Sequence, residues 1–188
     1  MKKLYLVRHG ETDWNVEKRY TGRSDMPINQ KGEEQAKRLK PFFEAITIDH
    51  AITSPLKRCV KTASFAGFAT NVQQEPDIME WNYGAYEGRT HEEIWKEKPD
   101  WNIFLDGAEQ GESVEDVLLR GKRVITSCLQ LEGNVLLFSH GHFCRVLAAL
   151  WLELPLEKAR NFALFNARVC VLGLHEAKPM IFHWNVTP

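Results

Sequence analysis

The sequence lacks paired cysteines, long hydrophobic runs and an export signal. It contains four cysteines, and no two of them have the C-x-x-C spacing of a redox or zinc motif. The longest apolar run covers residues 146–152, far short of the roughly 20 residues that a membrane-spanning helix needs. At the N-terminus the apolar run 4–7 ends at Arg8, which is too short for a secretory signal. We therefore expect a reduced, cytoplasmic protein that does not enter a membrane.

The chain also lacks an excess of charge of either sign, internal repeats and linker-like segments. Lys and Arg number 24 against 25 Asp and Glu, so composition gives no reason to expect binding to nucleic acid or to an anionic membrane surface. Hydrophobic residues make up 44% of the 188 residues and charged residues 26%, which is typical of a folded protein and not of a disordered one. We predict one domain spanning residues 1–188. The sequence does not indicate an oligomeric state.

Short apolar runs alternate with segments of helical periodicity. The runs that resemble buried strands are 3–7, 51–53, 134–138, 169–175 and 180–184, and the helical periods cover 36–46, 114–128 and 143–150. Ser54 before Pro55 predicts a helix N-cap, and Thr90 and Ser113 have the spacing of capping boxes. This alternation predicts an α/β fold, a three-layer αβα sandwich with a mostly parallel central sheet. In such sheets ligands bind beyond the carboxyl ends of the strands, here after Val7, Thr53 and Phe138.

The first of these strand ends leads into Arg8-His9-Gly10. In one interpretation, His9 is a nucleophile toward phosphorus, because an imidazole with an ordinary pKa near 6.5 is largely neutral at pH 7. In the other, His9 is a structural histidine, and the arginine caps the strand. These residues alone fit both interpretations.

The other two strand ends carry the same residue types. Arg58 falls in the first turn of the helix after the second strand, and Ser139-His140-Gly141 opens the helix after the strand 134–138. Two arginines and two histidines therefore come together at one edge of the sheet. A phosphoryl group needs this combination, with forked guanidinium donors and helix N-terminal N–H groups directed at the anion.

Residues 6–12, Leu-Val-Arg-His-Gly-Glu-Thr, resemble the opening signature of the histidine phosphatase (phosphoglycerate mutase-like) superfamily. The likeness continues through Trp14-Asn15, Tyr20-Thr21-Gly22, Asp25, Pro27, Gly32, Ser54-Pro55, Arg58, Thr62, Glu80, Tyr83-Gly84, Gly111-Glu112-Ser113 and Ser139-His140-Gly141. The resemblance implies a phosphoglycerate mutase-like fold.

The resemblance also implies a role for each matching residue. His9 takes the phosphoryl group and forms a phosphohistidine. Glu80 donates a proton to the leaving oxygen and then activates the water that hydrolyses the intermediate. Contacts with the phosphate or the substrate are implied for Arg8, Asn15, Thr21, Gly22, Arg58, His140 and Gly141.

A closer likeness is to the fungal sedoheptulose-1,7-bisphosphatase branch, through Tyr20-Thr21-Gly22 and the segments 80–88 and 101–107. It implies a sugar phosphate or bisphosphate as substrate. Aromatic faces for a sugar are expected from Trp14, Tyr20, Trp81, Tyr83 and Trp101, and Arg23 is expected to reach a second anionic group. The alternative is that each of these aromatic side chains is ordinary core packing.

Together these observations predict a metal-independent phosphomonoesterase that acts on a small phosphorylated metabolite and needs no cofactor. His140-Gly-His142 could supply two metal ligands, but no Cys cluster or H-E-x-x-H motif adds the others. The role of His142 is open, since a solvent-side and a substrate-facing position both fit. Two rival functions are a phosphoglycerate mutase-type phosphoryl transferase and a catalytically silent phosphate-binding module.

Overall fold

The computed structural model of the protein describes residues 2–188. Within them, six strands form one sheet in the order β3-β2-β4-β1-β5-β6. The strands are β1 (Lys3–Arg8), β2 (His50–Thr53), β3 (Gln73–Gln74), β4 (Val135–Ser139), β5 (Val169–His175) and β6 (Lys178–Val186). The pairs β1–β4, β2–β4 and β2–β3 are parallel, and the pairs β1–β5 and β5–β6 are antiparallel. The prediction of a mostly parallel α/β sheet is confirmed.

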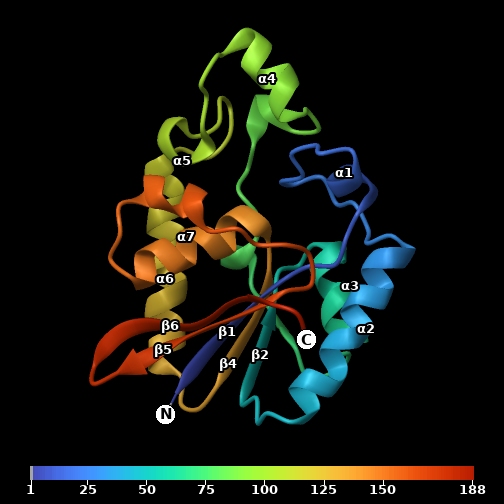
Figure 1. Cartoon of the computed structure of the whole chain (residues 1–188), viewed down its shortest axis with the longest axis vertical. Coiled ribbons are helices and arrows are strands. Elements are labelled where there is room, and N and C mark those ends of the chain that lie inside the picture. The colour runs from blue at the N-terminus through green and yellow to red at the C-terminus, as the bar shows by residue number, and fades with distance from the viewer. Residues whose placement is uncertain (1) are drawn as a thin grey trace.

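Helices cover both faces of the sheet (Figure 1). The α-helices are α1 (Asp13–Val16), α2 (Gln30–Glu44), α3 (Lys57–Phe65), α4 (His91–Glu97), α5 (Ile103–Asp106), α6 (Val114–Gln130) and α7 (Gly141–Trp151), and short 3₁₀ turns occupy Pro76–Ile78, Gly84–Tyr86 and Leu156–Asn161. Alternate residues of β1 divide between the two cores: Leu4 and Leu6 pack on the α6–α7 side, and Tyr5 and Val7 on the α2–α3 side. The strand is therefore apolar on both faces, as the unbroken run 3–7 indicates.

The strand 169–175 matches its predicted bounds, and β1, β2 and β4 lie within one residue of theirs. The sequence pattern missed β3, because two exposed glutamines carry no apolar signal. The capping boxes at Thr90 and Ser113 are confirmed. None of the helices in residues 2–188 combines the length and the apolar character needed to cross a bilayer.

The predicted N-cap at Ser54 is wrong. The helix α3 begins at Lys57, and its N-cap residue is Leu56, whose side chain makes no capping hydrogen bond. The Ser54 hydroxyl instead lies 2.8 Å from Nε2 of His140 and 3.4 Å from the backbone N–H of Leu56. The Ser54 side chain thus contacts His140, which follows the neighbouring strand β4, and does not cap α3.

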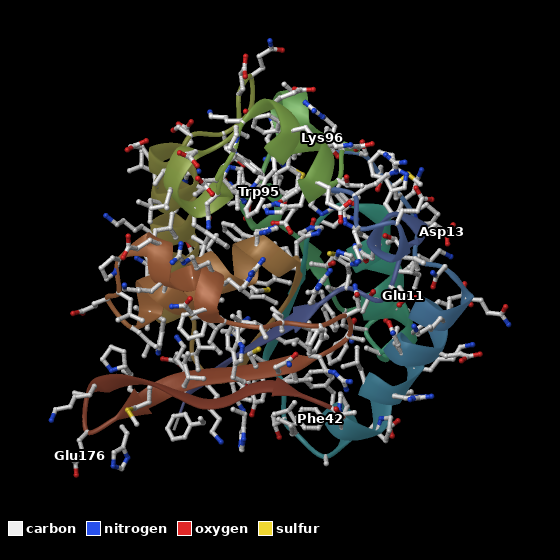
Figure 2. All side chains as sticks on the ribbon, turned by 45° about the horizontal axis from the view of Figure 1, so that its top comes forward. Glu11, Asp13, Phe42, Trp95, Lys96 and Glu176 are labelled. Atoms are coloured by element: carbon white, nitrogen blue, oxygen red, sulfur yellow. The ribbon has the colours of Figure 1, made fainter. Side chains whose placement is uncertain are left out.

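The carboxyl ends of β1 and β4 lead toward the end of the molecule that carries α1 and α4 (Figure 1). In Figure 2, Trp95 and Lys96 mark α4, and Glu176 marks the tip of the β5–β6 hairpin at the opposite end. The predicted functional residues therefore lie beneath α1 and α4, away from the hairpin.

Candidate active site

A cavity of about 330 Å³ opens at the end of the sheet where β1 finishes. Its walls come from the end of β1, the α1 region, the start of α4 and the first turns of α7. The lining residues are Arg8, His9, Asn15, Lys18, Arg19, Tyr20, Thr21, Glu80, Tyr83, His91, Gly141, His142, Arg145 and Asn166. Four of them are Arg or Lys and one is a carboxylate. The cavity therefore suits an anionic ligand.

His9 follows β1 directly, is 3% exposed, and is held by its backbone N–H, which donates to the carbonyl of Ser139 at 3.0 Å. Its ring Nδ1 lies 2.7 Å from the carbonyl oxygen of Gly10. A carbonyl oxygen only accepts, so Nδ1 carries the ring proton and Nε2 keeps its lone pair. Gly10 has to be glycine, because a Cβ there would lie 2.5 Å from the carbonyl oxygen of Gly32.

The surroundings of His9 favour its neutral form. Burial, followed by the nearby guanidinium groups of Arg58 and Arg8, holds the pKa of His9 well below 6.5. The ring is therefore neutral at pH 7, with its single proton on Nδ1. A neutral imidazole with an unused Nε2 is a competent nucleophile.

Glu80 lies against the N-terminus of α7 and is 4% exposed. Its Oε1 accepts the backbone N–H groups of Trp81 at 3.0 Å and Phe143 at 2.9 Å, and its Oε2 accepts that of His142 at 3.0 Å. The N-terminus of α7 thus supplies two of the three donors that fix the carboxylate. Oε2 has a single backbone partner and so keeps room for a further hydrogen bond.

Arg58 is fully buried behind the cavity and does not line it. Its Nε donates to Nδ1 of His140 at 3.1 Å. Its terminal amino groups donate to the carbonyls of Thr21 at 3.1 Å, Gly22 at 2.6 Å and Ser24 at 2.8 Å. Arg58 therefore holds the segment 21–24 against the end of β4, and its contact with a phosphate remains a prediction.

His140 is likewise fully buried. Since Nδ1 accepts from Arg58, Nε2 carries the proton and donates to the hydroxyl of Ser54. Burial, followed by the charge of Arg58, holds the pKa of His140 well below 6.5. The rings of His9 and His140 meet edge to face at 5.3 Å. His140 thus packs beside the proposed nucleophile, and its phosphate contact also stays a prediction.

Arg8 and Gly141 adjoin each other at the cavity wall. The Nη1 of Arg8 donates to the carbonyl of Leu164 at 2.7 Å, and its Nε is buried without a partner. A Cβ on Gly141 would lie 3.2 Å from that Nε, so the glycine leaves room for the arginine to pass. Burial lowers the pKa of Arg8. An anion in the cavity would satisfy the unused donor capacity of this side chain.

Asn15 and Thr21 line the cavity, as the resemblance implies. The Oδ1 of Asn15 accepts from the backbone N–H of Thr12 at 3.2 Å and from Nδ2 of Asn166 at 3.0 Å, so its own amide donors are left for a ligand. Gly22 does not line the cavity, and its backbone N–H donates to the carboxylate of Glu87 at 2.8 Å.

The expected sugar-facing side chains divide into two groups. Tyr20 and Tyr83 line the cavity and meet edge to face at 4.9 Å. The structure places Trp14, Trp81, Trp101 and Arg23 elsewhere, with Trp101 almost fully buried in the core. The ring of Trp81 is fully buried and its indole N–H donates to the carbonyl of Glu112. Arg23 is directed to the carboxylate of Glu112 at 3.6 Å, and Trp14 packs over Gly88.

The sequence analysis missed several lining residues, namely Lys18, Arg19, His91, Arg145 and Asn166. A signal existed for Arg145, because it is the only charged residue between His140 and Leu152. A charge in an otherwise apolar helix needs a polar environment, and here the cavity provides it. For the other residues the sequence carries no periodicity that points to a site.

The motif His140-Gly-His142 does not bring its two rings to one point. The ring of His140 bonds Arg58 and Ser54, whereas Nδ1 of His142 bonds the hydroxyl of Tyr83. Across residues 2–188, no three His, Cys, Asp or Glu side chains gather as metal ligands would. The open question about His142 is answered in part: it lines the cavity, with its side chain 20% exposed.

The two fully enclosed histidines predict a loss of stability in mild acid. Below pH 6.5 the unfolded chain binds a proton on His9 and on His140, whereas the folded chain does not, because both pKa values are held well below 6.5. The free energy of unfolding therefore falls as the pH falls through 6.5. Between pH 7.5 and pH 5.5 we expect a fall of about 1.4 kcal/mol for each of these two histidines, and a further fall from His142, because burial also holds its pKa well below 6.5.

Urea unfolding at the two pH values measures this fall. This pH range lies above the ordinary pKa values of Asp and Glu, which limits the contribution of carboxylates. The His9→Ala protein should lose about 1.4 kcal/mol of the pH effect, since the proton on this histidine no longer counts. Replacing the exposed His175 of β5 by alanine serves as the control and should leave the effect intact. Equal stability of the wild type at both pH values would contradict the assignment of two neutral buried rings.

Comparison with known proteins agrees with this geometry. The sequence profile of the histidine phosphatase superfamily (branch 1) matches residues 4–187. An acid phosphatase of Mycobacterium tuberculosis is 34% identical over 91% of this chain and 86% of its own length. A probable phosphoglycerate mutase of Cronobacter sakazakii is 34% identical over 99% of this chain and 91% of its own. The sedoheptulose 1,7-bisphosphatase of Saccharomyces cerevisiae is 33% identical over 81% and 68%, respectively.

The fold has a close counterpart among solved structures. The product of an open reading frame of Mycobacterium tuberculosis superposes with a TM-score of 0.95 at 32% identity, covering 99% of this chain and 98% of that one. The match of the family profile extends over nearly the whole sequence and includes every residue that the resemblance singled out. The chain belongs to the histidine phosphatase superfamily (branch 1).

Proposed function

We propose that this protein is a metal-independent phosphomonoesterase that hydrolyses small phosphorylated metabolites through a phosphohistidine on His9. The observation that carries the proposal is the tautomer of His9, whose Nδ1 proton is bonded to Gly10 and whose Nε2 is free in a cavity shared with Arg8 and Glu80. A nucleophile, a cation and a proton donor in one cavity are the groups that phosphoryl transfer through a covalent intermediate requires.

In the first step, the lone pair on Nε2 of His9 forms a bond to phosphorus while the bond between phosphorus and the ester oxygen breaks. Glu80 gives its proton to that oxygen, so the alcohol leaves neutral. The hydrogen bond from Nδ1 to Gly10 stabilises the positive charge that develops on the ring. The guanidinium of Arg8 offsets the negative charge of the transferring group.

In the second step, water replaces the histidine. The Glu80 carboxylate takes a proton from the water as its oxygen attacks phosphorus, and the bond from phosphorus to Nε2 breaks. Inorganic phosphate leaves, His9 returns to its neutral form, and Glu80 again holds its proton. No step requires an electron acceptor, a metal or an organic cofactor.

Sugar phosphates and bisphosphates are the substrates that we favour. Tyr20 offers an aromatic face beside the four cations of the cavity, and the almost fully buried Tyr83 supports it from behind at 4.9 Å. The names of the acid phosphatase and of the yeast sedoheptulose 1,7-bisphosphatase support hydrolysis of a phosphate ester and, for the second, of a sugar bisphosphate.

Phosphate release in the presence of EDTA tests the proposal. A panel of sugar phosphates, phosphoglycerates and p-nitrophenyl phosphate would be assayed with folded protein after chelation. We expect release from at least one sugar phosphate at the same rate with and without EDTA. Absence of release from every compound, or release that EDTA abolishes, would overturn the proposed activity.

A phosphoglycerate mutase-type transferase is the second candidate. The likeness to a probable phosphoglycerate mutase over 99% of the chain supports it, as does Tyr20-Thr21-Gly22. A mutase keeps its histidine phosphorylated and protects it from water. Adding 2,3-bisphosphoglycerate would then raise interconversion of the phosphoglycerates more than phosphate release, whereas a phosphatase would show the reverse.

A further inference from the structure

Arg145 occupies the second turn of α7 and borders the cavity. Its Nε donates to the carbonyl of Gly141 at 3.2 Å, and its guanidinium lies over the ring of Phe104 with the carbon 5.0 Å from the ring centre. One edge of the guanidinium is thus fixed by the helix, and one face by an aromatic ring. The side chain is positioned before any ligand arrives.

The charge of Arg145 has no protein partner. Within residues 2–188, no carboxylate oxygen lies within 4.0 Å of it, and its two terminal amino groups make no hydrogen bond. These amino groups are reachable from the cavity, since they are absent from the fully enclosed unpaired polar atoms, which are Nε of Arg8 and Nη1 of Arg23. By contrast, Arg19 is bonded to Glu17 and to the carbonyl of Gly88.

An unpaired guanidinium in a recessed position is costly. Burial lowers the pKa of Arg145, and the nearby carboxylate of Glu80 does not cancel that effect. An anion placed at the free fork would form two charge-assisted hydrogen bonds and restore the lost solvation. The terminal amino groups of Arg145 are therefore hydrogen-bond donors without an acceptor in the described part of the protein.

A second donor stands next to Arg145. His142 lies three residues earlier on α7, a spacing that puts the two side chains on the same helix face. A hydrogen bond joins the hydroxyl of Tyr83 and Nδ1 of His142. When the hydroxyl is the donor, Nε2 of His142 carries the ring proton and can donate to a ligand. The ring of Tyr20 stacks on His142 with centres 5.8 Å apart.

Of the three arginines that line the cavity, Arg19 is paired within the protein, and Arg8 and Arg145 approach from different elements. Arg8 adjoins His9 in the chain and passes beside Gly141, while Arg145 bonds the carbonyl of the same glycine from its own helix. Arg23, which the sequence suggested for a second anion, is outside the cavity and paired with Glu112. Arg145 therefore brings two amino groups without a partner in residues 2–188 to the cavity from α7, whereas Arg8 enters it from β1.

We propose that Arg145, assisted by His142, binds a second anionic group of the substrate, a phosphate or a carboxylate, while the group to be transferred lies at His9 and Arg8. This inference rests on the proposed function. It makes the protein selective for metabolites with two anionic groups over those with one.

Matched substrates in the Arg145→Gln protein test the proposal. Fructose 1,6-bisphosphate is compared with fructose 6-phosphate, and 3-phosphoglycerate with glycerol 3-phosphate, as ratios of kcat/KM. We expect at least one ratio to fall by about 10- to 100-fold, the size of a lost charge-assisted pair. The pair whose ratio falls distinguishes a second phosphate from a carboxylate. Arg145→Lys keeps the charge without the fork and should recover part of the ratio.

Arg23→Gln is the matched control, and we expect both ratios to keep their wild-type values. Unchanged ratios in Arg145→Gln would overturn the proposal. So would an equal loss for all four substrates, because Arg145 would then serve the transferred phosphate itself. A change of ratio in Arg23→Gln alone would assign the second anion to Arg23 instead.

Binding separates this inference from the proposed activity. Calorimetry in a His9→Ala background measures the affinities for fructose 1,6-bisphosphate and fructose 6-phosphate without turnover. We expect the bisphosphate to bind more tightly, and Arg145→Gln to abolish the difference. If the difference exists while the wild type releases no phosphate, the hydrolytic function fails and the anion site stands. Equal affinities, or no binding of either probe, would overturn the anion site.

Discussion

Replacing His9 by alanine should lower phosphate release by at least about a thousand-fold, because the covalent route depends on one nitrogen atom. Alanine removes Nε2 and also the bond from Nδ1 to Gly10, while the backbone N–H that pairs with Ser139 stays. The variant should therefore fold, and its loss should appear in kcat for every substrate. Steady-state assays on the best substrate of the panel measure the effect.

The intermediate provides a direct check on the same prediction. Rapid quenching of the wild type with ³²P-labelled substrate should trap protein-bound phosphate that is labile in acid and stable in alkali, as a phosphohistidine is. His9→Ala should trap none. Exchange of the exposed His175 for alanine is the control and should preserve trapping. If His9→Ala kept more than a tenth of the wild-type rate, the nucleophile would have to be another group.

The second large effect is expected for Glu80→Gln, which removes the transferable proton from the cavity. Loss of general acid–base catalysis corresponds to about 10²- to 10⁴-fold in rate. With a sugar phosphate both steps need this proton, so kcat should fall by that amount. Glutamine keeps the shape and one carbonyl oxygen, which can still accept from Trp81 and Phe143.

An aryl phosphate separates catalysis from structure in this variant. The p-nitrophenolate ion leaves without protonation, so the first step should stay fast and only hydrolysis of phospho-His9 should be slow. We expect a burst of p-nitrophenolate equal to the amount of enzyme, followed by a low steady rate. Wild-type hydrolysis of sugar phosphates by Glu80→Gln, or equal losses on both substrates without a burst, would refute the assignment.

The residues that follow strands were predictable from the sequence. His9 and His140 come directly after β1 and β4, whose apolar runs bury the strand on both faces, so that its carboxyl end falls at a defined edge of the sheet. Glu80 was found only through the resemblance. It lies in a connection without period, and its position depends on backbone donors from α7, a helix 60 residues farther along.

The residues that the sequence could not assign are those whose role depends on packing between distant segments. Trp81 and Tyr83 are two positions apart in the same loop and are both almost fully buried, yet only Tyr83 also borders the cavity. Both are large aromatic side chains that reach a hydrogen-bond partner, so the sequence does not distinguish them. Lys18 borders the cavity from a backbone position with φ of +58°, which no local pattern indicates.

The cavity has an inner wall built on the sheet and an outer wall built on connections, and this division matters for how the enzyme can diversify. His9 is anchored to β4 and Glu80 to α7, whereas Lys18 and His91 belong to the α1 region and the start of α4. A mutant library confined to positions 18 and 91 would alter which metabolite is admitted and leave the phosphoryl chemistry in place. Substitutions in the outer wall can therefore change the range of substrates while the fold and the inner wall stay the same.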